Sequence, residues 1–207
     1  MPDPLPFVDV LAPRKRPKPG ERRVQILQTL AAMLEQPGGE RITTSALAAR
    51  LGVSEAALYR HFASKAQMFE GLIEFIEHSV FSLINQITER EGAAADIAVG
   101  ADGARQAAKI IVMLLQFAEK NPGMARVMVG DALVFENERL QQRMNLFFDK
   151  VEAALKQALR GDSGHDAQVR AAVLAAFSVG RLQRFVRSGF KRLPTEHVDA
   201  SLVILLG

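Results

Sequence analysis

Apolar residues recur every three to four positions along most of the 207-residue chain from about residue 21 onward. This spacing is typical of amphipathic α-helices that turn one face toward a core. No segment alternates apolar and polar residues with the two-residue period of a strand over a useful length. The pattern therefore predicts an all-α protein with about nine helices.

Helix-breaking residues divide this pattern into elements. The first helix is expected over residues 21–35, before Pro37, Gly38 and Gly39. The last helix is expected after Pro194, with Thr195 as its N-cap. The longer helices between them are expected at residues 64–90, 104–120, 136–160 and 167–189, with a Gly- and Ala-rich loop at 92–103.

Residues 42–69 predict two short helices on a tight turn, followed at once by a longer helix. Thr43 or Thr44 can cap the first short helix, and Ser54 can cap the second through a backbone N–H bond. Gly52 lies between them, where a residue without a side chain tolerates positive φ. This layout is typical of a DNA-reading helix-turn-helix.

Charge is unevenly distributed along the chain. Residues 1–65 carry ten basic and six acidic side chains, whereas residues 66–207 carry sixteen basic and seventeen acidic ones. A basic arm before the first helix is either a solvated tail or a set of phosphate contacts. Together with the motif, these features predict a disordered proline-rich leader at 1–20, a DNA-binding domain at 21–66 and a helical dimerisation and partner-binding domain at 67–207.

The N-terminal half of the second short helix would enter the major groove. This half of the helix offers small or acidic side chains to the bases. Such a tip carries little direct base code, so DNA shape is expected to contribute to readout. Three of these residues also have structural explanations: Ser54 as a cap, Glu55 as a favourable charge at a helix N-terminus, and Tyr59 as a packing aromatic. The residues predicted to contact DNA are Thr43, Thr44, Ser54, Glu55, Ala56, Ala57, Tyr59, Arg60, His61 and Lys65.

Two aromatic residues of the helix at 64–90 do not fit its apolar stripe. Phe75 and Phe81 fall roughly 120° to either side of the stripe centre at helical spacing. The helix therefore either packs on several faces or exposes an aromatic side chain for a partner.

Several classes of function have no support in the sequence. The chain has no cysteine, and its four histidines show no metal-ligand spacing. No Ser/His/Asp grouping or glycine-rich phosphate loop appears, so we expect no catalytic activity and no cofactor. No apolar run approaches the roughly 20 residues of a membrane helix, and no signal peptide begins the chain. The expected location is the cytoplasm.

Three segments carry a resemblance to a known family. ITTSALAARLGVSEAALYRHFASKAQMF resembles the DNA-binding domain of TetR-type regulators. GVSEAALYRHFASKAQMFEGLIEFIE, FAEKNPGMARVMVGDALVFENERLQQRMNLFFDKVEAAL and GRLQRFVRSGFKRLPTE resemble the SlmA type of nucleoid occlusion factor within that superfamily. The likeness covers most of residues 21–200.

The resemblance implies a homodimer whose last two long helices pair in a four-helix bundle. It also implies binding to chromosomal palindromes, and so association with the nucleoid, with a dimer of dimers as a further arrangement on DNA. The DNA-bound protein would bind the division protein FtsZ and prevent ring assembly over the nucleoid, through a groove between the fourth and fifth helices. The residues that stand at the positions of this contact are Phe75, Met113, Gln116, Lys120 and Asn121.

The chain departs from the family pattern near that groove. Family members usually have a basic residue where Leu83 stands and a glycine where Gln116 stands. The alternative function is a ligand-responsive TetR-type transcriptional repressor. The residues that would line its ligand pocket, or else form plain core, are Met113, Phe117, Met124, Met128, Phe135, Phe147 and Phe148.

Overall fold

The computed structural model describes residues 20–36, 41–92, 102–161 and 166–207. These ranges contain nine α-helices and no strand, which confirms the predicted fold class. The predicted leader and most of the predicted 92–103 loop lie outside the described residues.

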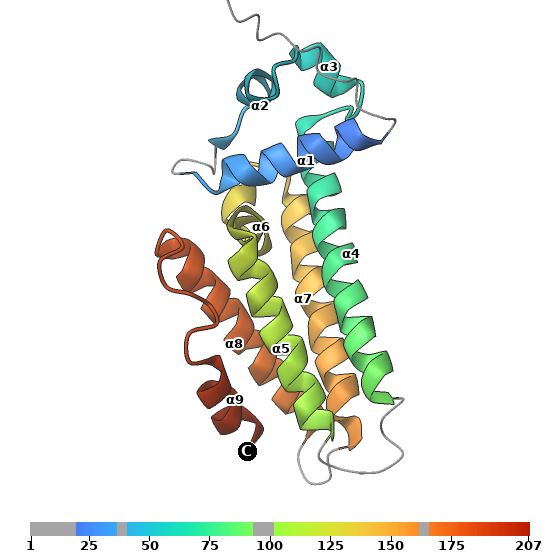
Figure 1. Ribbon diagram of the computed structural model, residues 1–207, viewed down its shortest axis with the longest axis vertical. Coiled ribbons are helices and arrows are strands. Elements are labelled where there is room, and N and C mark those ends of the chain that lie inside the picture. The colour runs from blue at the N-terminus through green and yellow to red at the C-terminus, as the bar shows by residue number, and fades with distance from the viewer. Residues whose placement is uncertain (1–19, 37–40, 93–101, 162–165) are drawn as a thin grey trace, which may run out of the picture.

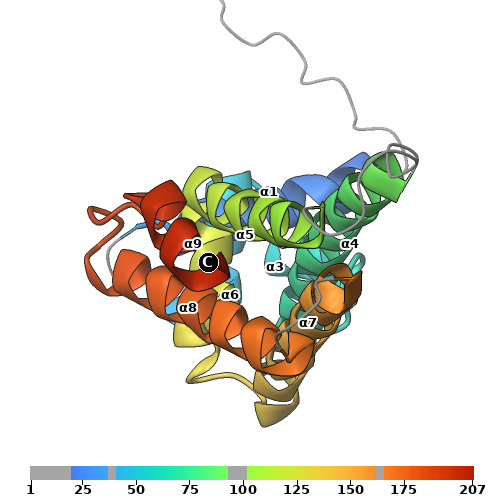
Figure 2. The ribbon, with the colours of Figure 1, turned by 90° about the horizontal axis from the view of Figure 1, so that it is seen from below.

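The first three helices form a head that contains the predicted helix-turn-helix, and the others form an elongated body below it (Figure 1). Within the body, α4, α5, α7 and α8 run lengthwise, while α6 lies beneath α1. Seen from below, α9 lies outside the others, against α5 and α8 (Figure 2). The helices are α1 Glu21–Leu34, α2 Thr44–Leu51, α3 Glu55–Tyr59, α4 Lys65–Gly92, α5 Asp102–Lys120, α6 Pro122–Met128, α7 Glu138–Ala158, α8 Ala167–Arg187 and α9 Val198–Leu206.

The turn and caps of the head follow the sequence prediction. Gly52 adopts the left-handed conformation with φ 66°. The Thr43 hydroxyl accepts a hydrogen bond from the Ala46 N–H at 3.1 Å, so Thr43 rather than Thr44 caps α2. The Ser54 hydroxyl accepts from the Ala57 N–H at 3.3 Å and caps α3. Each cap satisfies a backbone donor that the helix itself leaves without a partner.

The predicted cap of the last helix is wrong. The helix begins at Val198, after His197 in a left-handed conformation with φ 55°. The Thr195 hydroxyl donates instead to the Glu119 carboxylate on α5. A contact between distant parts of the chain therefore takes the side chain that local sequence assigned to capping. The structure also adds two short 3₁₀ helices that the sequence did not predict, Asp131–Leu133 (η2) and Leu159–Gly161 (η3).

One hydrophobic core runs from the head into the body. On α4 it buries most of the predicted apolar stripe, but Leu83, which the stripe included, is 37% exposed. Phe81 packs edge-on against Phe147 with ring centroids 5.5 Å apart. The residues considered for a ligand pocket do not share one environment. Met124, Met128 and Phe147 are buried in the core, whereas Phe135 is 58% exposed. They therefore do not enclose a common ligand.

The head meets the body where α1 crosses α6. At Gly123, on α6, an added Cβ atom would overlap the Ala31 carbonyl oxygen on α1. A glycine is therefore required for this close approach of α6 to α1, because backbone atoms on α1 cannot move aside as a side chain can. Nearby, the buried Arg126 side chain donates from Nη1 to the Gln36 carbonyl at 3.1 Å and lies over the Phe190 ring.

Gly123→Ala should lower the free energy of unfolding by about 3 kcal/mol, a typical cost for overpacking a tight contact. The melting temperature should fall by roughly 6 to 12 °C for a protein of this size. Thermal unfolding followed by circular dichroism measures both quantities. Pro122→Ala, at the adjacent first position of α6, is the matched control and should change stability by about 1 kcal/mol or less. Equal effects of the two variants would contradict the clash.

Candidate DNA and partner sites

The tip of α3 is small, exposed and linked to α2. Ser54, Glu55 and Ala56 are exposed, and Ala57 is half-buried. The Thr44 hydroxyl donates to the Glu55 carboxylate at 2.7 Å, which ties the first residue of α3 to the first residue of α2. Glu55 is thus held in place beside the helix N-terminus, where its charge is favourable.

Donors gather on the flank of the head. Tyr59 is 45% exposed, and its hydroxyl lies 3.4 Å from the Thr44 hydroxyl. Arg60 and His61 are exposed. Arg23 donates from Nη1 to the His61 carbonyl at 3.0 Å and covers the Phe62 ring at 4.2 Å. Part of the predicted basic arm is therefore anchored beside the two exposed donors, in an arrangement suited to phosphate oxygens.

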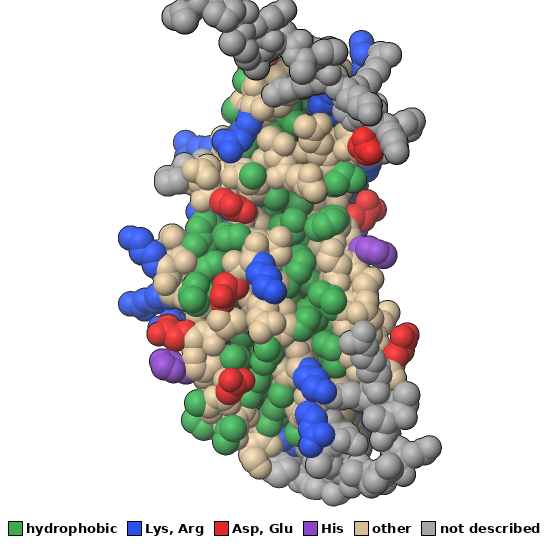
Figure 3. Space-filling view, in the orientation of Figure 1, with side chains coloured by type: hydrophobic (Ala, Val, Ile, Leu, Met, Phe, Trp, Pro, Cys, Tyr) green, Lys and Arg blue, Asp and Glu red, His purple; other side chains and the backbone are tan. Residues whose placement is uncertain are grey.

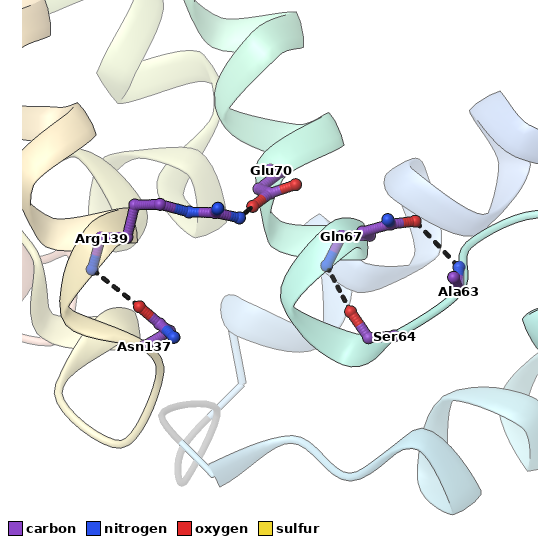
Figure 4. A network of polar contacts seen from close by, with 6 residues as sticks. All are labelled: Ala63, Ser64, Gln67, Glu70, Asn137 and Arg139. Atoms are coloured by element: carbon purple, nitrogen blue, oxygen red, sulfur yellow. Dashed lines mark hydrogen bonds and ion pairs between the residues drawn. The ribbon is translucent and has the colours of Figure 1, made fainter.

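The N-terminus of α4 is less free than the sequence indicated. Figure 4 shows the Ser64 hydroxyl accepting from the Gln67 N–H at 3.1 Å, and the Gln67 side chain accepting from the Ala63 N–H at 2.9 Å. This pairing is close to a capping box. The Lys65 ammonium lies 2.5 Å from the Glu136 carboxylate, whose side chain is only 8% exposed. The predicted phosphate donor thus has a partner within the protein.

Lys65 begins a charged strip between α4 and the start of α7, which comprises three ion pairs. Lys65 pairs with Glu136, as described. The other two pairs are Glu70 with Arg139 and Glu77 with Arg143, the second at 2.7 Å. Figure 4 shows Glu70 and Arg139 reaching toward one another, with Asn137 capping α7 at the Arg139 N–H.

The hydrogen bond to Glu77 raises the pKa of the Arg143 guanidinium above its usual value. The sequence analysis did not predict this strip. Acidic residues at helical spacing on α4 and basic residues at helical spacing on α7 could have indicated that the two helices pair through their charges.

Four of the five residues predicted to contact FtsZ lie on two helices, and Asn121 directly follows the second of them. On α4, Phe75 is 45% exposed. On α5, Gln116 and Lys120 are exposed, while Met113 is half-buried. The Asn121 side chain donates to the Phe117 carbonyl at 2.7 Å, so it serves partly to end α5. Leu83, on α4, is 37% exposed.

Met113 and Gln116 also line an open pocket of about 660 Å³ that the sequence did not predict. Its lining comes from α5, α9 and the end of α4, and Phe75, Lys120 and Asn121 are not part of it. The volume lies within the range of ligand sites, roughly 300 to 1,000 Å³. Figure 3 shows hydrophobic side chains gathered on this face of the body, with scattered Lys and Arg side chains among them.

Within the described ranges, no three His, Asp or Glu side chains lie close enough together to hold a metal ion. The helices of the same ranges include none with the length and hydropathy of a membrane span.

Solved structures of other regulators share this fold. A transcriptional regulator from Rhodococcus sp. Rha1 aligns with a TM-score of 0.70 at 22% identity, over 89% of this chain and 94% of that one. The fatty acid degradation regulator FadR from Bacillus halodurans aligns with a TM-score of 0.68 at 16% identity, over 94% and 97% of the two chains. At these identities the likeness concerns the fold alone.

Sequence comparisons identify both parts of the chain. Residues 26–72 match the family of bacterial regulatory proteins, tetR family. Residues 103–206 match the SlmA-like family described as tetracyclin repressor-like, C-terminal domain.

Full-length relatives give the narrower assignment. The nucleoid occlusion factor SlmA of Idiomarina loihiensis is 48% identical over 191 residues, which cover 89% of this chain and 93% of that protein. The nucleoid occlusion factor SlmA of Shewanella sp. strain MR-4 is 51% identical over 185 residues, or 86% and 89% of the two chains. The chain therefore belongs to the SlmA family of nucleoid occlusion factors, within the TetR-type regulators.

Proposed function

We propose that this protein binds chromosomal palindromes as a homodimer, binds FtsZ when on DNA, and so prevents division-ring assembly over the nucleoid. The observation that carries this proposal is the identity of about half of the residues with nucleoid occlusion factors along nearly the whole chain. The identity extends beyond the DNA-binding head and through the C-terminal body, so it is not confined to the helix-turn-helix. No catalytic step is required for this function.

An exposed apolar face on α7 and α8 supports the homodimer. Leu146 on α7 is 57% exposed, and Val169 and Val173 on α8 are 58% and 45% exposed. Val169 and Val173 are four residues apart and so share one face of the helix. Pairing of α7 and α8 with the same helices of a second copy would bury this face. It would also present two DNA-binding heads, as a palindromic site requires.

Phe75 supports the partner contact. Its ring lies off the buried stripe of α4 and remains 45% exposed, and aromatic side chains are frequent anchors of protein interfaces. Leu83, where the resemblance implies a basic residue, is 37% exposed on the same helix. The proposed contact with FtsZ is therefore expected to rely in part on apolar packing.

Mapping of bound sites across the genome, combined with an FtsZ polymerisation assay, tests the proposed function. We expect many dispersed palindromes and inhibition of FtsZ polymers by the DNA-bound protein. Occupancy of one or a few promoters, with FtsZ polymers unaffected, would instead indicate the ligand-responsive repressor.

Phe75→Ala should weaken binding to FtsZ by roughly 30-fold, about 2 kcal/mol, as expected for the loss of an aromatic anchor. DNA affinity should not change, because the ring lies on the body. Fluorescence anisotropy with labelled FtsZ tail peptide and with labelled palindromic DNA measures the two affinities.

The matched control for this variant is Phe135→Ala, which removes a ring of similar exposure, 58%, after η2. It should leave FtsZ affinity within about twofold of the wild type, because surface changes away from a hot spot usually have little effect. General unfolding of the Phe75 variant would show that the ring is structural.

Lys65→Ala should lower the slope of log affinity against log salt concentration by about one unit per DNA-binding head, as the loss of one phosphate contact requires. The effect should be similar for all DNA sequences, because phosphates carry no base code. Titration of specific and unrelated duplexes at several salt concentrations measures the slope. Glu136→Gln keeps the ammonium and removes its partner, so the slope should stay unchanged. An unchanged slope in Lys65→Ala would mean that the ammonium stays with Glu136 on DNA.

A further inference from the structure

Arg41 joins the DNA-binding head to the body through an aromatic ring. Its guanidinium covers the Phe135 ring, with 4.6 Å between Cζ and the ring centroid. Arg41 precedes α2 in the head, whereas Phe135 lies between η2 and α7 in the body. Within the described ranges, the guanidinium has this ring contact and neither an ion pair nor a hydrogen bond. The ring therefore covers one face of the group and leaves its N–H donors open, because those donors point outward in the guanidinium plane.

We propose that Arg41 is a further phosphate-binding residue of the DNA interface, and that Phe135 is the positioning residue that holds its guanidinium in place. This inference rests on the DNA binding in the proposed function. It gives the body a part in the affinity of each head for DNA, besides its role in dimerisation.

The position of Arg41 in the head is the first support. Arg41 stands two residues before Thr43, the cap of α2, and in a helix-turn-helix this first helix crosses the DNA backbone. The intervening Ile42 is buried, which fixes where Arg41 leaves the surface of the head. Thr43 and Thr44 line one small crevice together with Lys65. Arg41 thus stands at the start of α2, beside residues that were predicted to contact DNA.

A fixed ring is the second support. The Glu136 N–H donates to the Leu133 carbonyl at 3.0 Å, which closes the turn that carries Phe135. Leu133 is buried, and Asn137 caps α7 directly after the turn. The turn is thus held at both ends, while the Phe135 ring stays 58% exposed. A ring on a fixed turn orients a guanidinium without neutralising its charge, whereas a carboxylate would compete with phosphate.

The pairing of the neighbouring acid is the third support. Glu136 follows Phe135 in the chain, yet its carboxylate lies against the Lys65 ammonium, and its side chain is only 8% exposed. The two cations of the head therefore differ. Lys65 must leave a carboxylate to bind a phosphate, whereas Arg41 can bind one while its guanidinium stays on the ring.

Arg41→Ala should lower the slope of log affinity against log salt concentration by about one unit per head, because one phosphate contact is lost. Specific and unrelated duplexes should be affected alike. Fluorescence anisotropy with both duplexes at several salt concentrations measures the slope and the affinity. Arg160→Ala is the matched control, since it removes an exposed arginine from η3 in the body, and its slope should not change. An unchanged slope in Arg41→Ala would overturn the assignment of Arg41 to phosphate.

A double-mutant cycle tests the positioning role of Phe135. Phe135→Leu removes the ring and should weaken DNA binding about fourfold, whereas Phe135→Tyr keeps it and should stay within about twofold of the wild type. In the Arg41→Ala background, Phe135→Leu should have no further effect, because the ring acts through the guanidinium. Val134→Ala, at the neighbouring residue that is 68% exposed, is the matched control and should not change the affinity in either background.

Stronger DNA binding by Phe135→Leu would show that the ring withholds Arg41 from DNA, and would overturn the inference. Equal losses from Phe135→Leu with and without Arg41 would show that the ring only supports the head, and would overturn it as well. In both cases the wild-type protein would still bind the palindrome, so the proposed function would stand. Failure of the wild-type protein to bind any duplex would overturn both. Because this role concerns DNA alone, Phe135 variants saturated with DNA should bind FtsZ tail peptide as the wild type does.

Discussion

The position of the DNA-binding head depends on how α4 is held against the rest of the body. This one helix begins at the head and continues along the body, and the charged strip joins its first half to the start of α7. A second attachment lies where α1 crosses α6 at Gly123 and Arg126. Two attachments on different helices restrict rotation about either one, so the head and the body are held in a defined relative orientation. In the proposed dimer, the spacing of the two heads would then follow from the pairing of the bodies. That spacing must match the distance between the two half-sites of a palindrome.

Much of the fold could be predicted from the sequence because its signals are local. Apolar spacing gave the helices, and Thr43, Gly52 and Ser54 marked the turn and caps of the head, since capping and positive φ depend on neighbouring backbone atoms. The same spacing separated Phe75 and Phe81 from the α4 stripe, but could not say which of them finds a partner. The structure packs Phe81 against Phe147 and leaves Phe75 exposed. That choice depends on where α7 lies, which no local pattern contains.

Three features that the sequence did not reveal join distant segments. Thr195 has the chemistry of a helix cap, yet its hydroxyl is used by Glu119, 76 residues earlier in the chain. Lys65 has the chemistry of a phosphate donor, yet its ammonium meets Glu136. The open pocket on α5 exists only because α9 packs beside it. In each case the residue type was informative about chemistry, and the partner was decided by tertiary packing.

The helix α4 carries both the predicted phosphate donor Lys65 and the proposed partner residue Phe75, so it can couple DNA binding to partner binding. Lys65 at its start and Phe75 are ten residues apart, which corresponds to about 15 Å along the helix. The tip of α3 offers few groups for base readout, so affinity must come largely from phosphates and from two heads acting together. A phosphate that draws Lys65 away from Glu136 would weaken the first ion pair of the charged strip. Glu70 and Glu77 lie on either side of Phe75, so the other two ion pairs of the strip would decide whether the loss of the first pair is felt at Phe75. If DNA binding changes the affinity for a partner at Phe75, linkage requires that the partner change the affinity for DNA by the same factor.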